Sequence, residues 1–315
     1  MIDQCFLDAG PPCYLDSTKA ARRLAHGGSP KGLPMSNTIS APPSLVTLRN
    51  EIDRIDAEMH RLLMERGQII DRLIAVKGSQ ESGSAFRPAR EADMMRRLVQ
   101  RHAGILPLDT VEGIWRVIIA TFTYVQQPFS VHADLSAGDA MMRDSARFHF
   151  GFTVPFLTHM SASAVVAAVA ASRGDLGLVP AAYVAGAGAW WDALEPETAP
   201  KIIARLPFVE RADHPADLPV FVISRVSSDA MVKEVEVWSV HVSGWGPQAA
   251  NALPGAVTCV AAPDGAFDGA ALLISMPAGT QFETVRQALL KTGASIRSAA
   301  LVGSHATRYR VSAGG

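Results

Sequence analysis

The residues of this sequence that are equipped for chemistry are cations and polar side chains spread over residues 44–127. Six of them lie on amphipathic helical patterns: Arg49, Arg66, Lys77, Arg90, Glu91 and Gln126. Arg66 and Lys77 are 11 residues apart, which on a helix is three turns plus roughly 20°, so they share one face about 16 Å apart. Two cations beside an apolar wall suit a small ligand with two negative charges and an apolar ring.

Spacing alone leaves a second interpretation open, because Arg and Lys at helical intervals also form solvated faces. The net charge of −1, with 48% apolar and 19% charged residues, is typical of a globular protein without a global field for nucleic acid or anionic lipid. We therefore expect no nucleic-acid partner and no membrane partner. Any anion binding must come from a local cluster of cations.

A long helix must position the first three cations. Apolar residues from Leu45 to Val76 recur at steps of three and four, Ser44 can cap the start, and Gly78 marks the end. About 33 residues correspond to roughly 50 Å. Such a helix cannot bury its apolar stripe in one small domain, which favours a second copy of the chain beside it. In an antiparallel pair, the partner's Arg49 would approach Arg66.

Two shorter helices must position the remaining polar residues. Pro88 opens a helix that we expect to run to about His102, with Arg90 and Glu91 in its first turn. Asp109 is predicted to cap a third helix over residues 110–127, which Pro128 stops. Residues 44–128 are thus predicted to form an all-α unit of three helices.

Three stretches of this unit resemble the all-helical chorismate mutases. The first helix of that family is similar to Leu48–Asp56, followed by Leu62-Leu63-x-Glu65-Arg66 and Lys77. Its second helix resembles Arg90-Glu91 before Met94–Leu98, and its third resembles Ile118-Ile119 through Gln126-Gln127. The resemblance implies an intertwined homodimer that rearranges chorismate to prephenate. It covers a little over a quarter of the chain.

The resemblance also implies a role for each polar residue. Arg66 and the partner's Arg49 hold the two carboxylates of chorismate, and Lys77 and Gln126 hydrogen-bond its ether oxygen. Glu91 binds the ring hydroxyl, with Arg90 beside it. A pericyclic step needs a compactly held substrate and fixed donors, so we expect no metal and no cofactor. The chain departs from the family at two positions, where Arg87 replaces an Asp and Phe122 replaces a Ser.

The remaining chain predicts mixed α/β structure. Strands are expected at 176–180, 220–224, 237–242, 256–261, 271–276 and 308–311, with helices at 165–172 and 281–292 and a charged link at 227–236. Residues 129–226 resemble prephenate dehydratases, but Ala181-Ala182-Tyr183 stands in place of Glu-Asn-Ser and Pro219-Val220 in place of Thr-Arg. Residues 227–315 resemble an amino-acid-sensing ACT module. The expected fold class is therefore multidomain, with a helical mutase unit followed by dehydratase-like and ACT-like lobes.

Three functions remain open at this point. The favoured one is a dimeric chorismate mutase whose C-terminal region is non-catalytic or regulatory. The alternatives are a bifunctional mutase and prephenate dehydratase, which the replaced residues disfavour, and a regulator that binds an aromatic-pathway ligand without turnover.

The first 43 residues lack a pattern. Early acids and scattered Gly and Pro, without a continuous apolar stretch, predict a disordered N-terminal extension rather than a secretory signal, and Met35 is a candidate start. Cys5, Cys13 and Cys259 have neither CxxC spacing nor paired histidines. We therefore expect no zinc site and no disulfide, and a cytoplasmic location.

Overall fold

The computed structural model describes residues 44–77, 85–136, 138–182, 188–225, 232–253, 256–261 and 269–311. The predicted extension over residues 1–43 and residues 227–231 of the predicted link lie outside the described residues, and the end of that link is described and enters strand β7 (Val235–Ser243). The chain divides into two compact units, Met1–Asp56 and Ala57–Gly315. None of the described helices combines the length and the apolarity that a membrane crossing requires.

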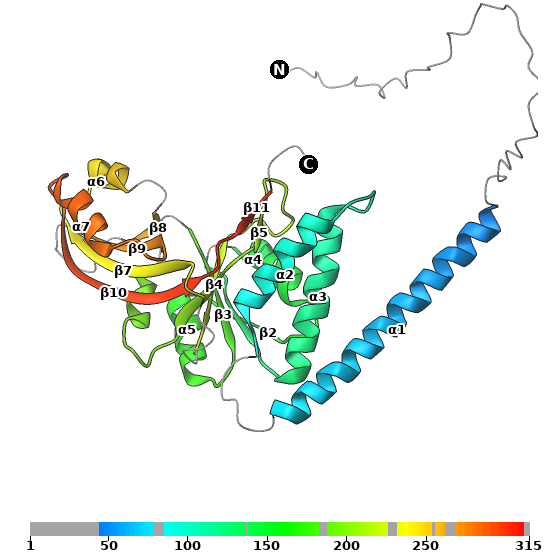
Figure 1. The fold of residues 1–315 in the computed structure, drawn as a ribbon. Helices are drawn as coiled ribbons and strands as arrows, with labels where there is room; N and C mark the ends of the chain where they lie inside the picture. The colour runs from blue at the N-terminus through cyan, green and yellow to red at the C-terminus, as the bar shows by residue number, and fades with distance from the viewer. Residues whose placement is uncertain are drawn as a thin grey trace, which may run out of the picture. The chain divides into compact units, whose positions relative to one another are not determined.

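Helix α1 (Leu45–Lys77) confirms the predicted long helix of 33 residues (Figure 1). The Ser44 Oγ accepts a hydrogen bond from the Thr47 backbone N–H at 3.1 Å, which confirms the predicted cap. The helix keeps its apolar stripe in water. Five of its large apolar residues are 47–56% exposed: Ile52, Ile55, Met59, Leu62 and Ile69. An exposed apolar stripe of this length is typical of a surface that packs against another helix or another chain.

Helices α2 (Pro88–Arg101) and α3 (Leu108–Gln126) confirm the two shorter helices. The predicted cap of α3 is wrong, because Pro107 occupies that position and the helix begins at Leu108. Proline has no N–H to satisfy, so the helix can follow it directly. Asp109 lies inside the first turn, where its Oδ1 accepts from the Thr110 N–H at 2.8 Å and suits the positive end of the helix dipole.

The α/β part is built on a nine-stranded sheet with the order β2-β1-β3-β6-β4-β10-β7-β9-β8 (Figure 1). Its strands are β1 (Val131–Asp134), β2 (Phe156–His159), β3 (Leu176–Pro180), β4 (Lys201–Leu206), β6 (Val220–Ser224), β7 (Val235–Ser243), β8 (Val257–Ala261), β9 (Gly269–Pro277) and β10 (Ser295–His305). A separate pair joins β5 (Val209–Glu210) to β11 (Tyr309–Arg310). The strand predicted at 308–311 is therefore this short one.

Strands β1, β2 and β3 are parallel, and helices α4 (Asp139–Phe150) and α5 (Ala162–Ala171) connect them. Gly177 of β3 lets α5 come close, because a Cβ there would lie 2.7 Å from Cγ1 of Val165. The predictions of β3, β6 and the α5 helix are confirmed. Strands β1, β2 and β4 were not predicted.

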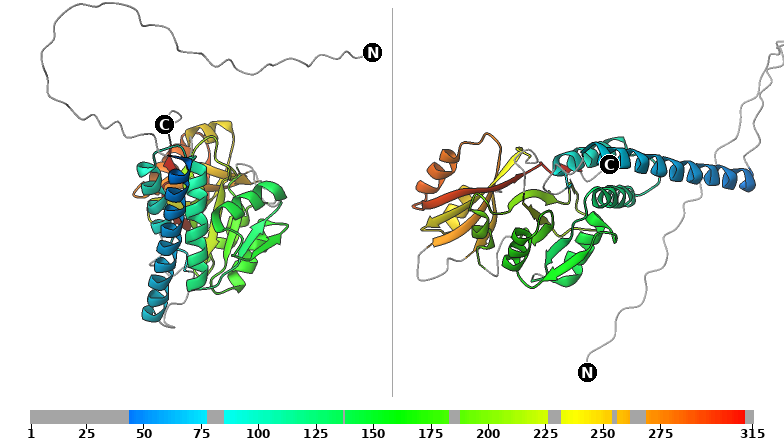
Figure 2. Two further views of the ribbon diagram at one scale, coloured as in Figure 1. Left: turned by 90° about the vertical axis from the view of Figure 1, so that its right-hand side faces the viewer. Right: turned by 90° about the horizontal axis from the view of Figure 1, so that it is seen from below.

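The C-terminal half follows the order β7, α6 (Pro247–Ala252), β8, β9, α7 (Phe282–Leu290), β10. Strand β9 alternates between two cores, as a strand covered on both faces must. Leu272 and Ile274 pack with α6 and α7, whereas Ala271 and Leu273 pack with α5 and the short helix η2 (Trp190–Leu194). Figure 2 shows α7, in orange, against one face of these strands. The predicted strands and helix here are confirmed, but β10 was missed.

The sheet continues across the predicted boundary between residues 226 and 227. Strand β4 pairs with β10 in parallel, with Ile202 opposite Gly303. The contact is close, because a Cβ on Gly303 would lie 2.2 Å from the Ile202 carbonyl oxygen. The two α/β regions therefore share one sheet, and their status as separate functional domains stays a prediction.

Candidate active site on the helical unit

Arg66 is the predicted site residue with the most informative surroundings. Its guanidinium carbon lies 4.9 Å from the centre of the Phe122 ring of α3, and the side chain is half-buried. Burial lowers the pKa of Arg66, and the positive charge of Arg90 lowers it further. Among the described residues no carboxylate forms an ion pair with Arg66. Two neighbouring cations without a shared carboxylate favour the binding of an anion.

Glu91 is buried, with 4% exposure, in the first turn of α2. Burial raises the pKa of Glu91, while Arg116 of α3 opposes this, with Nη1 donating to Oε2 at 2.7 Å. Arg116 was not among the predicted site residues, and it lies on α3 four residues after buried Glu112. One oxygen of the carboxylate that was predicted to bind a hydroxyl is thus held by a buried cation.

Gln126 ends α3, and its Nε2 donates to the Phe122 carbonyl oxygen at 3.0 Å. An amide nitrogen carries two hydrogens, so a second donor remains for a ligand. Arg66 thus contacts the ring of Phe122 and Gln126 contacts its backbone carbonyl, at one of the two positions where the chain departs from the family.

Of the other three predicted site residues, Arg90 and Arg49 form no hydrogen bond or ion pair with a described side chain. Arg90 is exposed on α2. Lys77 is the last residue of α1, and its side chain lies outside the described part of the structure. Arg49 is exposed and belongs to the unit that ends at Asp56. Arg87, the second departure, occupies the N-cap position of α2.

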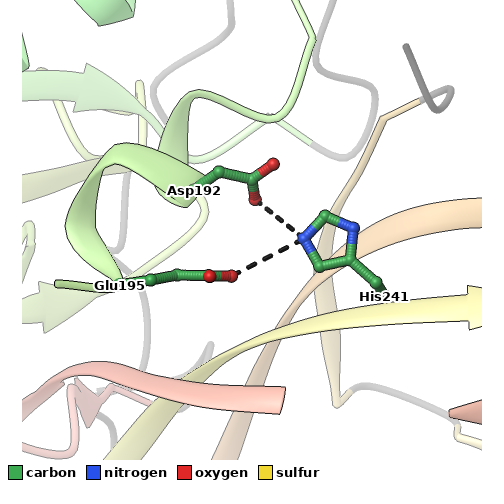
Figure 3. Close-up of side chains that lie close together, drawn as sticks. All are labelled: Asp192, Glu195 and His241. Atoms are coloured by element: carbon green, nitrogen blue, oxygen red, sulfur yellow. Dashed lines mark hydrogen bonds and ion pairs between the residues drawn. The ribbon is translucent and has the colours of Figure 1, made fainter. Parts of the chain in front are cut away.

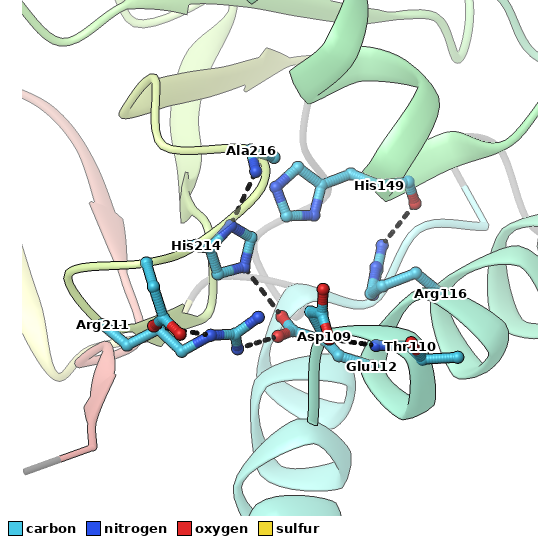
Figure 4. Close-up of polar contacts among 9 residues, drawn as sticks. Asp109, Thr110, Glu112, Arg116, His149, Arg211, His214 and Ala216 are labelled. Carbon is cyan, nitrogen blue, oxygen red and sulfur yellow. Dashed lines mark hydrogen bonds and ion pairs between the residues drawn. The ribbon is translucent and has the colours of Figure 1, made fainter. Parts of the chain in front are cut away.

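A buried polar network supports α3 on the side of α4 (Figure 4). Glu112 Oε2 accepts from Arg211 at 2.7 Å, and Glu112 Oε1 lies 3.3 Å from His214 Nε2. The His214 Nδ1 accepts from the Ala216 N–H at 2.9 Å, so the ring carries its proton on Nε2 and donates to Glu112. Arg116 Nη2 donates to the His149 carbonyl oxygen at 3.0 Å. The network fixes α3 to α4 and to the segment after β5.

The positions compared with the dehydratase motifs also meet in space. Ala181 follows β3, Pro219 precedes β6, and the Ala181 N–H donates to the Pro219 carbonyl oxygen at 2.8 Å. Pro180 lies opposite Val220 in the antiparallel pair. Ala181 and Pro219, which belong to the two replaced dehydratase motifs, thus lie side by side. Neither side chain carries a carboxylate or a guanidinium.

The geometry defines an all-helical unit with a cation pair beside a buried acid, followed by an α/β region. Residues 48–127 match the family described as chorismate mutase type II. These residues therefore form a chorismate mutase type II domain, which confirms the resemblance seen in the sequence. No solved structure gives a significant match to the chain.

The chain is also similar to curated proteins named bifunctional chorismate mutase/prephenate dehydratase. The protein of Neisseria gonorrhoeae is 35% identical over 117 residues, which are 37% of this chain and 31% of the relative. The proteins of Aquifex aeolicus and Pseudomonas aeruginosa are each 29% identical over 140 residues, or 43% of this chain and 38% of the relative. The chain thus spans less than half the length of these relatives.

Proposed function

We propose that the protein is a chorismate mutase of aromatic amino acid biosynthesis, which converts chorismate to prephenate in the cytoplasm. The observation that carries the proposal is the pair of Arg66 and Arg90 beside buried Glu91, inside the matched residues 48–127. The active form is a homodimer in which the partner's Arg49 completes the site. The exposed stripe of α1 supports this form, because it needs a cover.

The proposed mechanism uses binding and electrostatics only. Arg66 and the partner's Arg49 hold the two carboxylates and keep the reacting ends of the substrate together. The C–O bond of the ether breaks as a C–C bond forms between the two reacting ends, and Lys77 together with the free amide hydrogen of Gln126 stabilises the negative charge that develops on the ether oxygen. Glu91 accepts a hydrogen bond from the ring hydroxyl while Arg116 keeps the carboxylate in place.

We propose that the C-terminal region has no catalytic activity of its own or has a regulatory role. Ala181 and the pair Pro219-Val220 support this, because they stand in place of the glutamate and of the Thr-Arg pair of the dehydratases. The order β-α-β-β-α-β over residues 235–305 supports an ACT-like sensing role for the last part. The alternative is a bifunctional mutase and dehydratase. It is supported by the names of the relatives and by alignments of 140 residues, longer than residues 48–127.

The deciding experiment follows chorismate consumption and prephenate and phenylpyruvate formation by the purified protein. Lys77→Ala is expected to lower the mutase rate by about 10²–10³, as loss of an oxyanion donor does. Arg61→Ala is the matched control on the same helix, because Arg61 is exposed and pairs with Glu58 and Glu65. Chorismate left intact by a folded dimer would contradict the mutase and favour a ligand-binding regulator. Phenylpyruvate would show the bifunctional enzyme.

A further inference from the structure

We propose that Asp192, Glu195 and His241 form a binding site for a divalent transition-metal ion of the zinc type. Nε2 of His241 lies 3.1 Å from Oδ1 of Asp192 and 3.6 Å from Oε1 of Glu195, and Figure 3 shows both carboxylates directed at this nitrogen. All three ligand atoms lie within 4.8 Å of one another. An ion held at about 2.0–2.2 Å from each would separate its ligand atoms by about 3–3.5 Å.

The short helix η2 and strand β7 position the three side chains so that they face one another. In a 3-10 helix residues i and i+3 are eclipsed, so Asp192 of η2 and Glu195 just after it share a face. Trp191 and Leu194 are fully buried and fix η2 against the core. His241 lies in the middle of β7, between β10 and β9.

Neighbouring groups orient the ligands in the way that supporting residues of metal sites do. The Ser239 hydroxyl, two residues from His241 on the same face of β7, donates to Glu195 Oε1 at 2.7 Å. Lys201 Nζ donates to the Pro196 carbonyl oxygen at 2.8 Å and to the Leu194 carbonyl oxygen. Lys201 thus fixes the turn through its backbone, and its hydrogen bonds go to carbonyls rather than to the carboxylates.

The donor set selects the class of ion. One imidazole nitrogen and two carboxylate oxygens suit zinc and its first-row neighbours, and three protein ligands leave a position for water. A divalent cation would balance the two carboxylates. The sequence predicted no zinc site because it has neither CxxC spacing nor paired histidines. Asp192 and His241 lie 49 residues apart in the sequence, and only the fold brings them together.

The test titrates Zn²⁺ into the full chain by calorimetry, with bound zinc counted by mass spectrometry. Cys5→Ser and Cys13→Ser are introduced throughout, because cysteine thiolates are themselves zinc ligands. We expect one Zn²⁺ per chain. The double substitution Asp192→Asn with Glu195→Gln keeps side-chain size and should weaken binding by about 100-fold or more. His159→Gln is the matched control, because His159 lies 2.9 Å from His132 in a separate histidine pair, and it should leave affinity unchanged.

Thermal unfolding gives an independent readout, because an ion that binds the folded chain raises its Tm. Zn²⁺ should raise the Tm of the parent chain and of His159→Gln but not that of the double variant. If the double variant does not fold, His241→Gln replaces it. Equal zinc affinity with and without the substitutions, or no binding at millimolar Zn²⁺, would overturn the proposal and leave an ion pair between His241 and the carboxylates. None of these readouts depends on mutase activity.

Discussion

Arg116 is the side chain on which the polar interior of α2 and α3 depends. It is 1% exposed, and it donates both to Glu91 and to the His149 carbonyl oxygen. Two buried charges offset the cost of leaving water only while both are present. The pair therefore links the fold of the helical unit to the acid that the proposed reaction uses.

Arg116→Met should destabilise the protein by roughly 3–5 kcal/mol, because it leaves Glu91 buried without its counter-charge. Adding Glu91→Leu should recover part of this loss, since the double variant buries no charge at this place. Urea denaturation of the two single variants and the double variant gives the coupling energy. Strictly additive losses would show that the two residues do not act as a pair.

His305 gives the protein a stability that depends on pH. Burial lowers the pKa of His305 to about 4, while the unfolded chain keeps the ordinary 6.5. Between these values the unfolded chain binds more protons, so the free energy of unfolding decreases as the pH falls below about 6.5. The loss between pH 7 and pH 5 is about 2 kcal/mol.

Urea denaturation at several pH values checks this prediction with His305→Gln beside the parent chain. The variant should lack this part of the acid-dependent loss. His149, whose pKa burial lowers well below 6.5, contributes equally to both proteins and cancels in the comparison. Parallel stability profiles would mean that His305 titrates normally in the folded protein.

Among the elements, α1 has the apolar surface that the proposed dimer would bury. Ile55 is 47% exposed in the middle of its apolar stripe. Ile55→Asp should weaken the proposed dimer by at least about 10–100-fold in Kd, because each buried isoleucine contributes about 1.5–3 kcal/mol. Sedimentation at several concentrations measures this, with Glu51→Gln on the same helix as the control. Unchanged self-association would remove α1 from the interface.

The elements that the sequence predicted well are those whose local pattern matches their burial. Strands β3 and β6 are buried at every position and read as continuous apolar runs. Strand β10 was missed because its first seven residues are largely exposed and only its last four are buried. The cations of the site came from helical spacing and family resemblance. Arg116 and the Asp192–His241 cluster escaped because their partners lie 25 and 49 residues away.

At the scale of the whole molecule, the junction at Gly303 decides whether the α/β region unfolds as one body. Gly303→Ala should destabilise the protein by more than about 2 kcal/mol, because its Cβ would overlap the Ile202 carbonyl. Gly246→Ala is the matched control, since a Cβ there meets nothing within 4 Å. Calorimetry should show one transition for the control and a lower or divided transition for Gly303→Ala. Equal profiles would mean that β4 and β10 separate without cost.

The shared sheet has a practical consequence for work with shortened forms of this protein. A chain that stops after residue 226 keeps β4 but lacks β10. The unpaired backbone groups of β4 would then form an open edge, and such edges recruit further strands and promote aggregation. Poor solubility or low activity of that fragment would therefore report the exposed edge, and would not show that the C-terminal region takes part in catalysis.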